Sequence, residues 1–417
     1  MDLRLRGLHD IDPESVPLPH GTEVVTRVDR LAGERRIPQG AVGRVVRVDG
    51  DSVHVRVVGV GEAIYARGEV SPRKAGQLRF ARQREAAWSA LCPCVVLDAV
   101  VGSQAWGLAD ASSDVDRRGV FVLPFSWTSG LAAPPAELVS ADGSATYWEV
   151  GKAVRQALRA DPNTLEVFFA PAVEISDCMG QWLRDERDAF VSGEIYGSFG
   201  RYALSQAKKL RQSLLLAEHR SLLLAWLAAA PDTTLDQAAV RLADATGISA
   251  PSQADRLLRA REYIKQLYRS LHDQALIAEA NFAGLVDLAQ RGAAELELPR
   301  ELRPKNAYNL LRLIATAIEW LRTGAVDLAV REPLRTRLLE IKSGAVPLAA
   351  VLDQAEELAA ELEDARHSTR LPERADVTRA DRLLRRVREE AARRWIAREP
   401  GPFGAGAPPC EEARWEE

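Results

Sequence analysis

The sequence predicts an α/β core that follows a small β-barrel and precedes a helical domain. Between residues 17 and 72, apolar and polar positions alternate in short runs, which is typical of half-buried strands. After them, the apolar runs CVVLDAVVG and RRGVFVLP alternate with helical segments, as in an α/β sheet. From about residue 173 onward, apolar residues recur at three- and four-residue spacing, which is the helical period.

We therefore expect a barrel over residues 1–75, an α/β core over 76–172, a helical domain over 173–397 and a disordered tail over 398–417. The tail is rich in glycine and proline and ends in acids, a composition that favours disorder. PHGTEVVTRV and PQGAVGRVVRV look like the paired turns of SH3-like and KOW-like barrels. Such barrels often bind nucleic acid or protein, and a packing or dimerisation module is the alternative.

The composition of the chain argues against several classes of protein. The chain has 417 residues, 27% of them charged, and a net charge of −4, which argues against a nonspecific coat on duplex DNA. We find no apolar run of membrane-spanning length and no apolar core of a signal peptide, so we expect a cytoplasmic protein. Four scattered cysteines do not suggest a disulfide framework or a zinc site, and we expect them to be small core residues.

The candidate catalytic residues lie in the segment VVGSQAWGLADASSDVDRRGVFVLP. An apolar strand ends at Gly102-Ser103, and Asp114 and Asp116 precede the next strand. If both acids lie on a strand, their side chains share one face and repel each other unless a cation lies between them. A pair of Mg²⁺ ions, about 3.5–4 Å apart, would resolve this and carry out phosphoryl transfer. Gly102 would let the backbone approach a phosphate, and the Ser103 hydroxyl with nearby N–H groups would bind it.

Gly-Ser followed by Asp-x-Asp resembles the signature of the polymerase β-like nucleotidyltransferase superfamily. The fuller string GSQAWG…SSDVDRRGVFVLP, with YWEVGKAVRQALRADPNTLEVFFAP and FGRYALSQAKKL after it, is similar to the RNA-ligase-associated nucleotidyltransferase family. The resemblance spans residues 92–387 with gaps. It implies a polymerase β-like core, two Mg²⁺ ions (Mn²⁺ being possible), an NTP substrate such as ATP and an RNA acceptor.

The resemblance also implies a third carboxylate on a later strand, which completes the metal site and assists as general base. Glu149 is the leading candidate because relatives carry an acid there. Some relatives have another acid five residues earlier, where this chain has Ser144, and Asp142 is the nearest alternative.

Other residues have two interpretations each. Arg117 and Arg118 bind phosphate or are exposed strand-end arginines, and Glu166 anchors a loop or takes part in catalysis. The basic residues of the later helices bind nucleotide or acceptor, or else face solvent or pack beside the cleft: Lys208, Lys209, Lys305 and Arg312.

The function expected from the sequence is transfer of a nucleoside monophosphate from an NTP to an acceptor hydroxyl, most plausibly on RNA during repair or modification. Two alternatives remain open. A protein acceptor would make the chain an AMPylating enzyme, and a non-catalytic protein that binds nucleotide or RNA would have kept only the fold.

Overall fold

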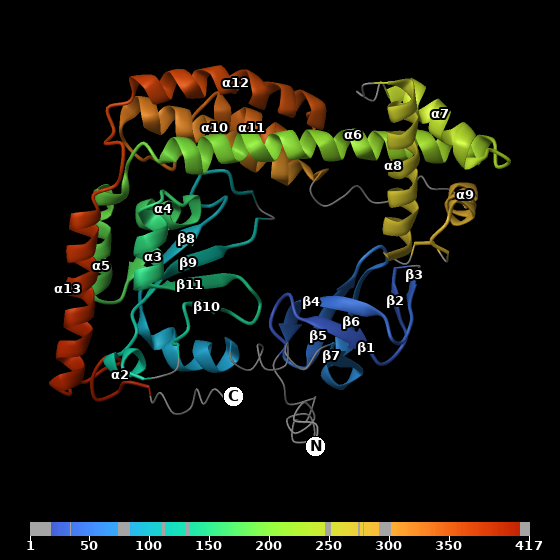
Figure 1. Ribbon diagram of the computed structural model, residues 1–417. Helices are drawn as coiled ribbons and strands as arrows, with labels where there is room; N and C mark the ends of the chain where they lie inside the picture. The colour runs from blue at the N-terminus through green and yellow to red at the C-terminus, as the bar shows by residue number, and fades with distance from the viewer. Residues whose placement is uncertain are drawn as a thin grey trace. The chain divides into compact units, whose positions relative to one another are not determined.

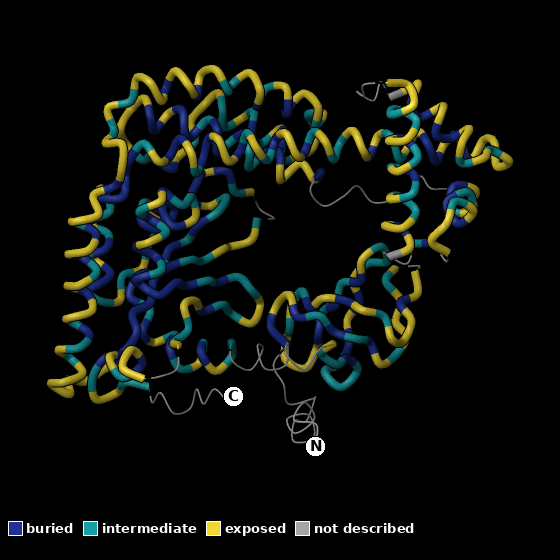
Figure 2. Tube along the Cα trace, in the orientation of Figure 1, coloured by how far each residue is buried: buried dark blue, intermediate teal, exposed yellow. Residues whose placement is uncertain are grey.

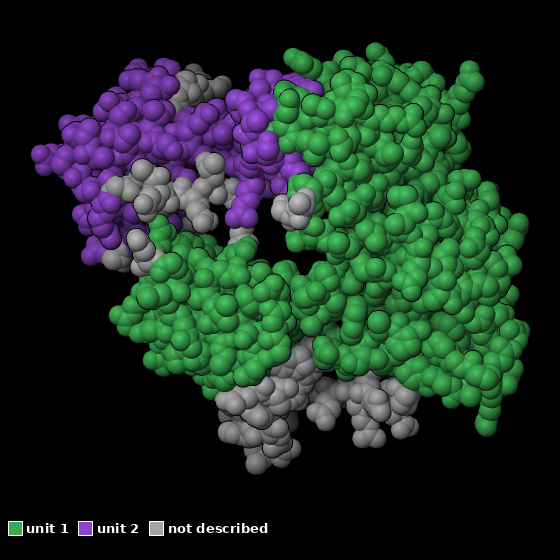
Figure 3. Space-filling model, turned by 180° about the vertical axis from the view of Figure 1, so that it is seen from behind, with its two compact units in different colours: residues 1–204, 311–340, 357–417 green, residues 205–310, 341–356 purple. Residues whose placement is uncertain are grey.

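The computed structural model describes residues 18–33, 35–73, 84–110, 113–130, 133–246, 252–273, 276–277, 279–291 and 302–408 (Figure 1). The chain divides into two compact units (Figure 3). The first comprises Met1–Leu204, Leu311–Glu340 and Glu357–Glu417, and the second Ser205–Leu310 and Ile341–Glu356. Within the first unit, an N-terminal sheet precedes an α/β core.

The N-terminal sheet has five antiparallel strands in the order β6-β5-β4-β1-β7. Alternate residues are buried, such as Val53, Val55 and Tyr65, which confirms the predicted period of two. The predicted closed SH3-like barrel is not confirmed, because in the described residues the edge strands β6 and β7 do not pair. The strands of this region are β1 Glu23–Thr26, β2 Arg30–Ala32, β3 Arg35–Ile37, β4 Val42–Asp49, β5 Ser52–Val57, β6 Gly61–Ala66 and β7 Val70–Pro72.

The predicted α/β core is present as a mixed five-stranded sheet in the order β10-β11-β9-β8-β12. Strand β9 pairs antiparallel with β8 and parallel with β11, so the chain crosses over between β9 and β11. The strands are β8 Val95–Val101, β9 Asp116–Phe121, β10 Glu137–Val139, β11 Ala145–Glu149 and β12 Val173–Ile175.

Helices α3 (Val150–Ala157), α4 (Pro162–Phe169) and α5 (Cys178–Asp185) pack on this sheet (Figure 1). Side chains cap their N-termini: Asp161 accepts from Thr164 N at 3.0 Å at the start of α4. The backbones of α5 and β8 approach closely at Gly180, where a Cβ would come 2.0 Å from the Val96 carbonyl oxygen. Strands β8 and β11 are largely buried, whereas the edge strands β10 and β12 are partly exposed (Figure 2).

The predicted helices follow the sheet. Their bounds are α6 Tyr202–Ala229, α7 Leu235–Thr246, α8 Gln253–Asp273, α9 Phe282–Gln290, α10 Pro304–Thr323, α11 Leu334–Lys342, α12 Leu348–Ser368 and α13 Val377–Ile396. The short helix α2, Phe125–Thr128, comes earlier, between β9 and β10. The second unit has its own apolar core, which includes Leu223, Leu242 and Leu285. The sequence also predicts a helix over residues 77–91; the structure has a helix at residues 84–91, and 77–83 lie outside the described residues. Among the helices described, none is long and apolar enough to cross a membrane.

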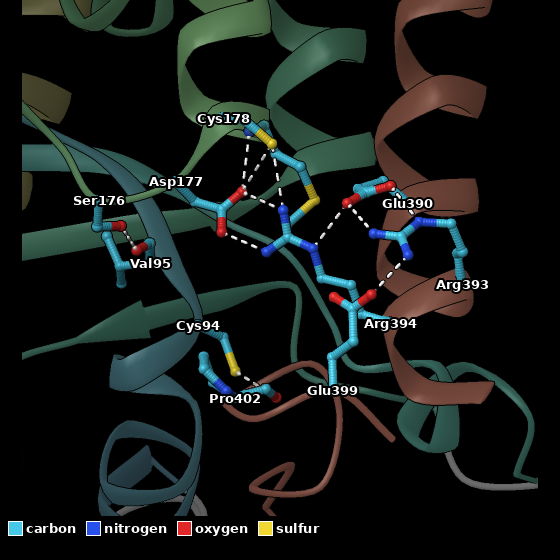
Figure 4. Close-up of polar contacts among 11 residues, drawn as sticks. Cys94, Val95, Ser176, Asp177, Cys178, Glu390, Arg393, Arg394, Glu399 and Pro402 are labelled. Atoms are coloured by element: carbon cyan, nitrogen blue, oxygen red, sulfur yellow. Dashed lines mark hydrogen bonds and ion pairs between the residues drawn. The ribbon is translucent and has the colours of Figure 1, made fainter. Parts of the chain in front are cut away.

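The C-terminal segment corrects the prediction of a disordered tail. Helix α13 is joined to the core by Arg394, whose guanidinium lies 2.5 Å from Asp177 (Figure 4). Beyond the helix, Phe403 is 3% exposed, and Trp127 Nε1 donates to the Pro408 carbonyl at 3.0 Å. Residues 398–408 are therefore packed on the core, whereas 409–417 lie outside the described residues.

The cysteines agree only in part with the expected core positions. Cys94 is buried, Cys92 is half-buried, and Cys178 is exposed at the first residue of α5. Burial raises the pKa of the Cys94 thiol to about 12, so it remains protonated at neutral pH. Cys410 lies outside the described residues.

Candidate active site

The two aspartates lie where the chain enters β9. Asp116 is the first residue of the strand and pairs with Val101, the last residue of β8. Asp114 lies two residues before the strand, so strand alternation does not place it, and the prediction that both acids are strand residues is corrected. Both residues are exposed and accessible to a cation.

Gly102 brings the turn after β8 close to Asp116. Its φ is +67°, in the left-handed region that favours glycine. A Cβ at Gly102 would lie 3.2 Å from Oδ2 of Asp116, so the absence of a side chain permits the approach. The structure therefore brings together two features that the sequence predicted separately, the Gly-Ser turn and an aspartate of the Asp-x-Asp motif.

The turn continues as a compact loop over residues 102–108, in which Trp106 N donates to the Gly102 carbonyl at 3.3 Å and Leu108 N donates to the Ser103 carbonyl at 2.8 Å. Three consecutive amides, those of Ser103, Gln104 and Ala105, donate no backbone hydrogen bond within the described residues. Successive N–H groups after a left-handed residue can form an anion-binding concavity. The loop thus has the donors that a phosphate group needs.

Glu166 on α4 is hydrogen-bonded to this loop. Its Oε1 accepts hydrogen bonds from Gly102 N at 2.7 Å and from Trp106 Nε1 at 2.6 Å, and the residue is 5% exposed. Of its two interpretations, the loop anchor is the one that these contacts support. Because Gly102 N donates to Glu166, this amide points away from any bound phosphate.

Two arginines from later helices also contact the loop region. The Arg312 guanidinium lies 4.0 Å from the centre of the Trp106 ring, and Trp106 also stacks on Trp320 at 6.0 Å. Arg335 Nε donates to the Gly107 carbonyl at 3.1 Å. For Arg312, the geometry supports packing beside the loop rather than a direct phosphate contact. Arg335 is a contact that sequence reasoning missed, because a lone arginine on a distant helix gives no local signal.

Arg117 and Arg118 project to opposite faces of β9 because neighbouring side chains alternate along a strand. Arg117 Nη2 lies 2.7 Å from Asp98 and 3.2 Å from Glu174. The hydrogen bond to Asp98 raises the pKa of Arg117, and Tyr147 donates to the same carboxylate at 3.0 Å. Arg117 is therefore held by acids on the face away from Asp116.

Arg118 lies on the same face of β9 as Asp116, two residues further along the strand. Its Nη1 donates to Asn163 Oδ1 and lies 3.8 Å from Glu166 Oε2. Both partners belong to α4, three residues apart on one face of the helix.

Glu149 is not where the sequence led us to expect it. The parallel register pairs Ala145 with Arg117 and Glu149 with Phe121, which puts Glu149 at the far end of β9 from Asp116. Phe121 is also five residues from Asp116, so strand alternation points Glu149 to the other face. The prediction that Glu149 lies beside the aspartates is therefore corrected.

The Glu149 carboxylate has a structural role instead. It caps α3 by accepting from Lys152 N at 3.0 Å, and it lies 3.2 Å from Arg388 Nη2. With 7% exposure, it is a buried acid whose partners are already in place.

Ser144 is the residue level with Asp116, since it precedes the Ala145–Arg117 pair and its carbonyl accepts from Arg117 N at 2.8 Å. Asp142 Oδ1 accepts from Ser144 Oγ at 2.8 Å and from Ser140 Oγ at 2.5 Å. Partial burial opposes ionisation, but these hydrogen bonds prevail and lower the pKa of Asp142. In the described part of the chain, no three His, Cys, Asp or Glu side chains form a group that could hold a metal ion.

Lys208 and Lys209 are exposed on α6, and both belong to the second unit. Lys305 is exposed at the start of α10, also in that unit. These placements agree with solvent-facing lysines, and their binding roles stay predictions.

The comparisons with known proteins agree with the motif. No curated protein and no solved structure gives a significant match to the chain. Residues 74–220, which include Gly102, Asp114, Asp116 and the anchoring Glu166, match the family model described as "RNA repair pathway DNA polymerase beta family" (RlaP). This segment of the chain is therefore similar to a polymerase β-like nucleotidyltransferase family.

Proposed function

We propose that the chain moves a nucleoside monophosphate from an NTP to an acceptor hydroxyl and releases pyrophosphate. The observation that carries this proposal is the approach of Gly102 to Asp116, which puts a loop with three amides that donate no backbone hydrogen bond in the described residues beside an exposed carboxylate of the Asp-x-Asp motif. A nucleotidyltransferase needs these two parts side by side, because it must hold a triphosphate and stabilise the charge that develops during transfer.

The loop and the acids have separate roles in the proposed reaction. The amides of residues 103–105 and the Ser103 hydroxyl bind the β- and γ-phosphates. Asp114 and Asp116 would hold Mg²⁺, or Mn²⁺ in its place, through carboxylate oxygens. The donor set fits Mg²⁺, which commonly takes one or two carboxylates and completes its shell with water and substrate phosphates. When bound, the metal activates the attacking hydroxyl and neutralises charge on the phosphates.

Asp142 is the remaining candidate for the third acid. The hydrogen bonds that it receives from Ser140 and Ser144 all reach Oδ1, and within the described residues Oδ2 has no such partner. Asp142 is exposed and stays ionised at neutral pH because its pKa is lowered. We infer that it acts on the acceptor hydroxyl, directly or through Ser144.

For the acceptor, we propose a terminal hydroxyl of RNA, and for the donor ATP. The family description supports an RNA repair pathway. A protein acceptor is an outcome that the same experiment detects.

A second candidate function is nucleotide binding without transfer. One observation favours it: a hydroxyl residue, Ser144, lies level with Asp116 at the end of β11. If Asp142 does not serve as the third acid, the two aspartates would bind a metal–nucleotide complex without activating the acceptor.

The experiment that tests both functions supplies the full-length chain with Mg²⁺, single-stranded RNA and either [α-³²P]ATP or [γ-³²P]ATP. Transfer of a nucleoside monophosphate labels RNA from the α-phosphate only, and the other three NTPs serve as competitors. Asp116→Asn provides the inactive control. Label on the protein would identify a protein as the acceptor. ATP binding without label on RNA or protein would favour the non-catalytic function.

A further inference from the structure

The candidate phosphate-binding loop is hydrogen-bonded to a buried carboxylate, that of Glu166. Glu166 is 5% exposed, and its Oε1 is hydrogen-bonded to Gly102 N and Trp106 Nε1. These two bonds fix the loop, but neutral N–H donors do not cancel the charge of the carboxylate. A nucleoside triphosphate is itself strongly negative, so an uncompensated carboxylate at this position would oppose its binding.

Arg118 supplies the opposite charge. Its Nη1 lies 3.8 Å from Glu166 Oε2, and among the described residues this is the ion pair that Glu166 makes. The Arg118 side chain is 33% exposed, so water screens the pair only in part. A hydrogen bond to Asn163 Oδ1 on the same helix fixes the guanidinium beside the carboxylate.

The ion pair between Arg118 and Glu166 adjoins the residues of the candidate site. Arg118 shares the face of β9 that carries Asp116, and Glu166 accepts a hydrogen bond from Gly102, whose Cβ position faces Asp116. Arg117 does not duplicate the function, because its guanidinium pairs with Asp98 and Glu174 on the other face.

We propose that Arg118 is a positioning residue that acts through Glu166: it neutralises the carboxylate that fixes the loop and so allows the loop to hold a triphosphate. The inference rests on the proposed function in one respect, since it takes the loop as the site of the NTP phosphates. In this role Arg118 makes no phosphate contact, unlike the direct ligand that the sequence suggested.

The two roles of Arg118 predict different results in a double-mutant cycle. We expect Arg118→Met to weaken ATP binding, because it leaves Glu166 charged and unpaired beside the triphosphate. Glu166→Gln removes that charge and keeps an oxygen that accepts from Gly102 and Trp106, so it isolates the effect of the charge and is the reference for the double variant. The double variant should then bind like Glu166→Gln, because no charge remains for Arg118 to compensate.

Titration calorimetry of the full-length chain with ATP and Mg²⁺ measures these affinities. We expect Arg118→Met to bind about five- to tenfold more weakly than the wild type and the double variant to recover most of that loss. Arg388→Met is the matched control, since it unpairs another buried glutamate, Glu149, at the opposite end of the sheet. It should leave ATP affinity unchanged.

A double variant that binds as weakly as Arg118→Met would overturn the inference, because the loss would then come from a missing phosphate contact. If Arg118→Met does not fold, the comparison of Glu166→Gln with the double variant still distinguishes the two roles of Arg118. If Arg118 contacted the phosphates directly, the double variant would bind ATP more weakly than Glu166→Gln. A wild type that binds ATP without transferring a nucleotide contradicts only the proposed function. A wild type that binds neither ATP nor inorganic triphosphate contradicts both.

Discussion

Gly102 faces Asp116 at the end of the β8–β9 pair, where a Cβ on the glycine would lie 3.2 Å from the carboxylate Oδ2. The same residue has a φ of +67°, which side chains rarely tolerate. The backbone conformation and the tight space beside Asp116 therefore each disfavour a side chain here.

Gly102→Ala separates these two requirements when it is compared with Gly107→Ala. Gly107 has a φ of +68° but open space around its Cβ position, so it carries only the backbone strain. Both variants should lose about 1–2 kcal/mol in the free energy of unfolding. Gly102→Ala should in addition displace Asp116 and reduce the transfer rate much more. Equal rates in the two variants would mean that the approach to Asp116 has no catalytic importance.

Asp114→Asn and Asp116→Asn should each abolish transfer while the fold is retained. Each change removes one charged ligand of the metal, and it also relieves repulsion between the carboxylates, so the melting temperature without Mg²⁺ should hold or rise. Asp185→Asn is the control, because Asp185 is an exposed acid on α5 outside the site. Near-wild-type turnover in either site variant would show that the site is assigned to the wrong residues.

Ser144→Asp should increase metal-dependent transfer. The change puts a carboxylate immediately before β11, level with Asp116, where the structure has only a hydroxyl. The apparent affinity for Mg²⁺ in the transfer assay should rise, and the melting temperature without metal should fall because a third acid adds repulsion. The control is Ser140→Asp, which adds an acid to the same turn but four residues before that level. A fall in both transfer and Mg²⁺ affinity for Ser144→Asp would show that position 144 does not face the metal.

The sequence predicted those parts of the site that depend on local signals. Gly102 and Asp116 were recognisable because a strand, a glycine turn and a second strand follow one another directly. The third acid depends on the register between β9 and β11, which no local pattern reveals. Glu149 is an acid at the start of a helix, and there a cap and a metal ligand look the same in a sequence.

Long-range packing explains the other differences between the sequence predictions and the structure. The tail after Arg398 has the composition of a disordered segment, yet Phe403 is buried and Pro408 accepts a hydrogen bond from Trp127. Strand alternation predicted the N-terminal strands correctly, but closure into a barrel requires pairing of β6 with β7, which alternation does not determine.

Glu149→Gln should reduce stability and leave the chemistry intact. The change weakens the cap of α3 and unpairs Arg388, so we expect a loss of about 1 kcal/mol in the free energy of unfolding. The transfer rate per folded molecule should equal that of the wild type, because Glu149 lies at the far end of the sheet from Asp116. A large fall in kcat at unchanged stability would restore Glu149 as the third acid.

Glu390 should make the docking of α13 sensitive to acid. Hydrogen bonds from Arg393 and Arg394 lower the pKa of Glu390 to about 2, below the usual value of about 4.3 in an unfolded chain. A lowered pKa means that the contribution to stability is complete above the unfolded value and is lost as the pH falls from about 4.3 towards 2. Glu390→Gln should therefore lower the melting temperature at pH 7 and reduce its decline over that acidic range. Glu389→Gln is the matched control, because the neighbouring Glu389 is exposed and makes no ion pair within the described residues. Melting curves recorded by circular dichroism from pH 2.5 to 7 would contradict the assignment if the two variants lost stability in parallel at every pH, since the ion pairs with Arg393 and Arg394 would then contribute nothing.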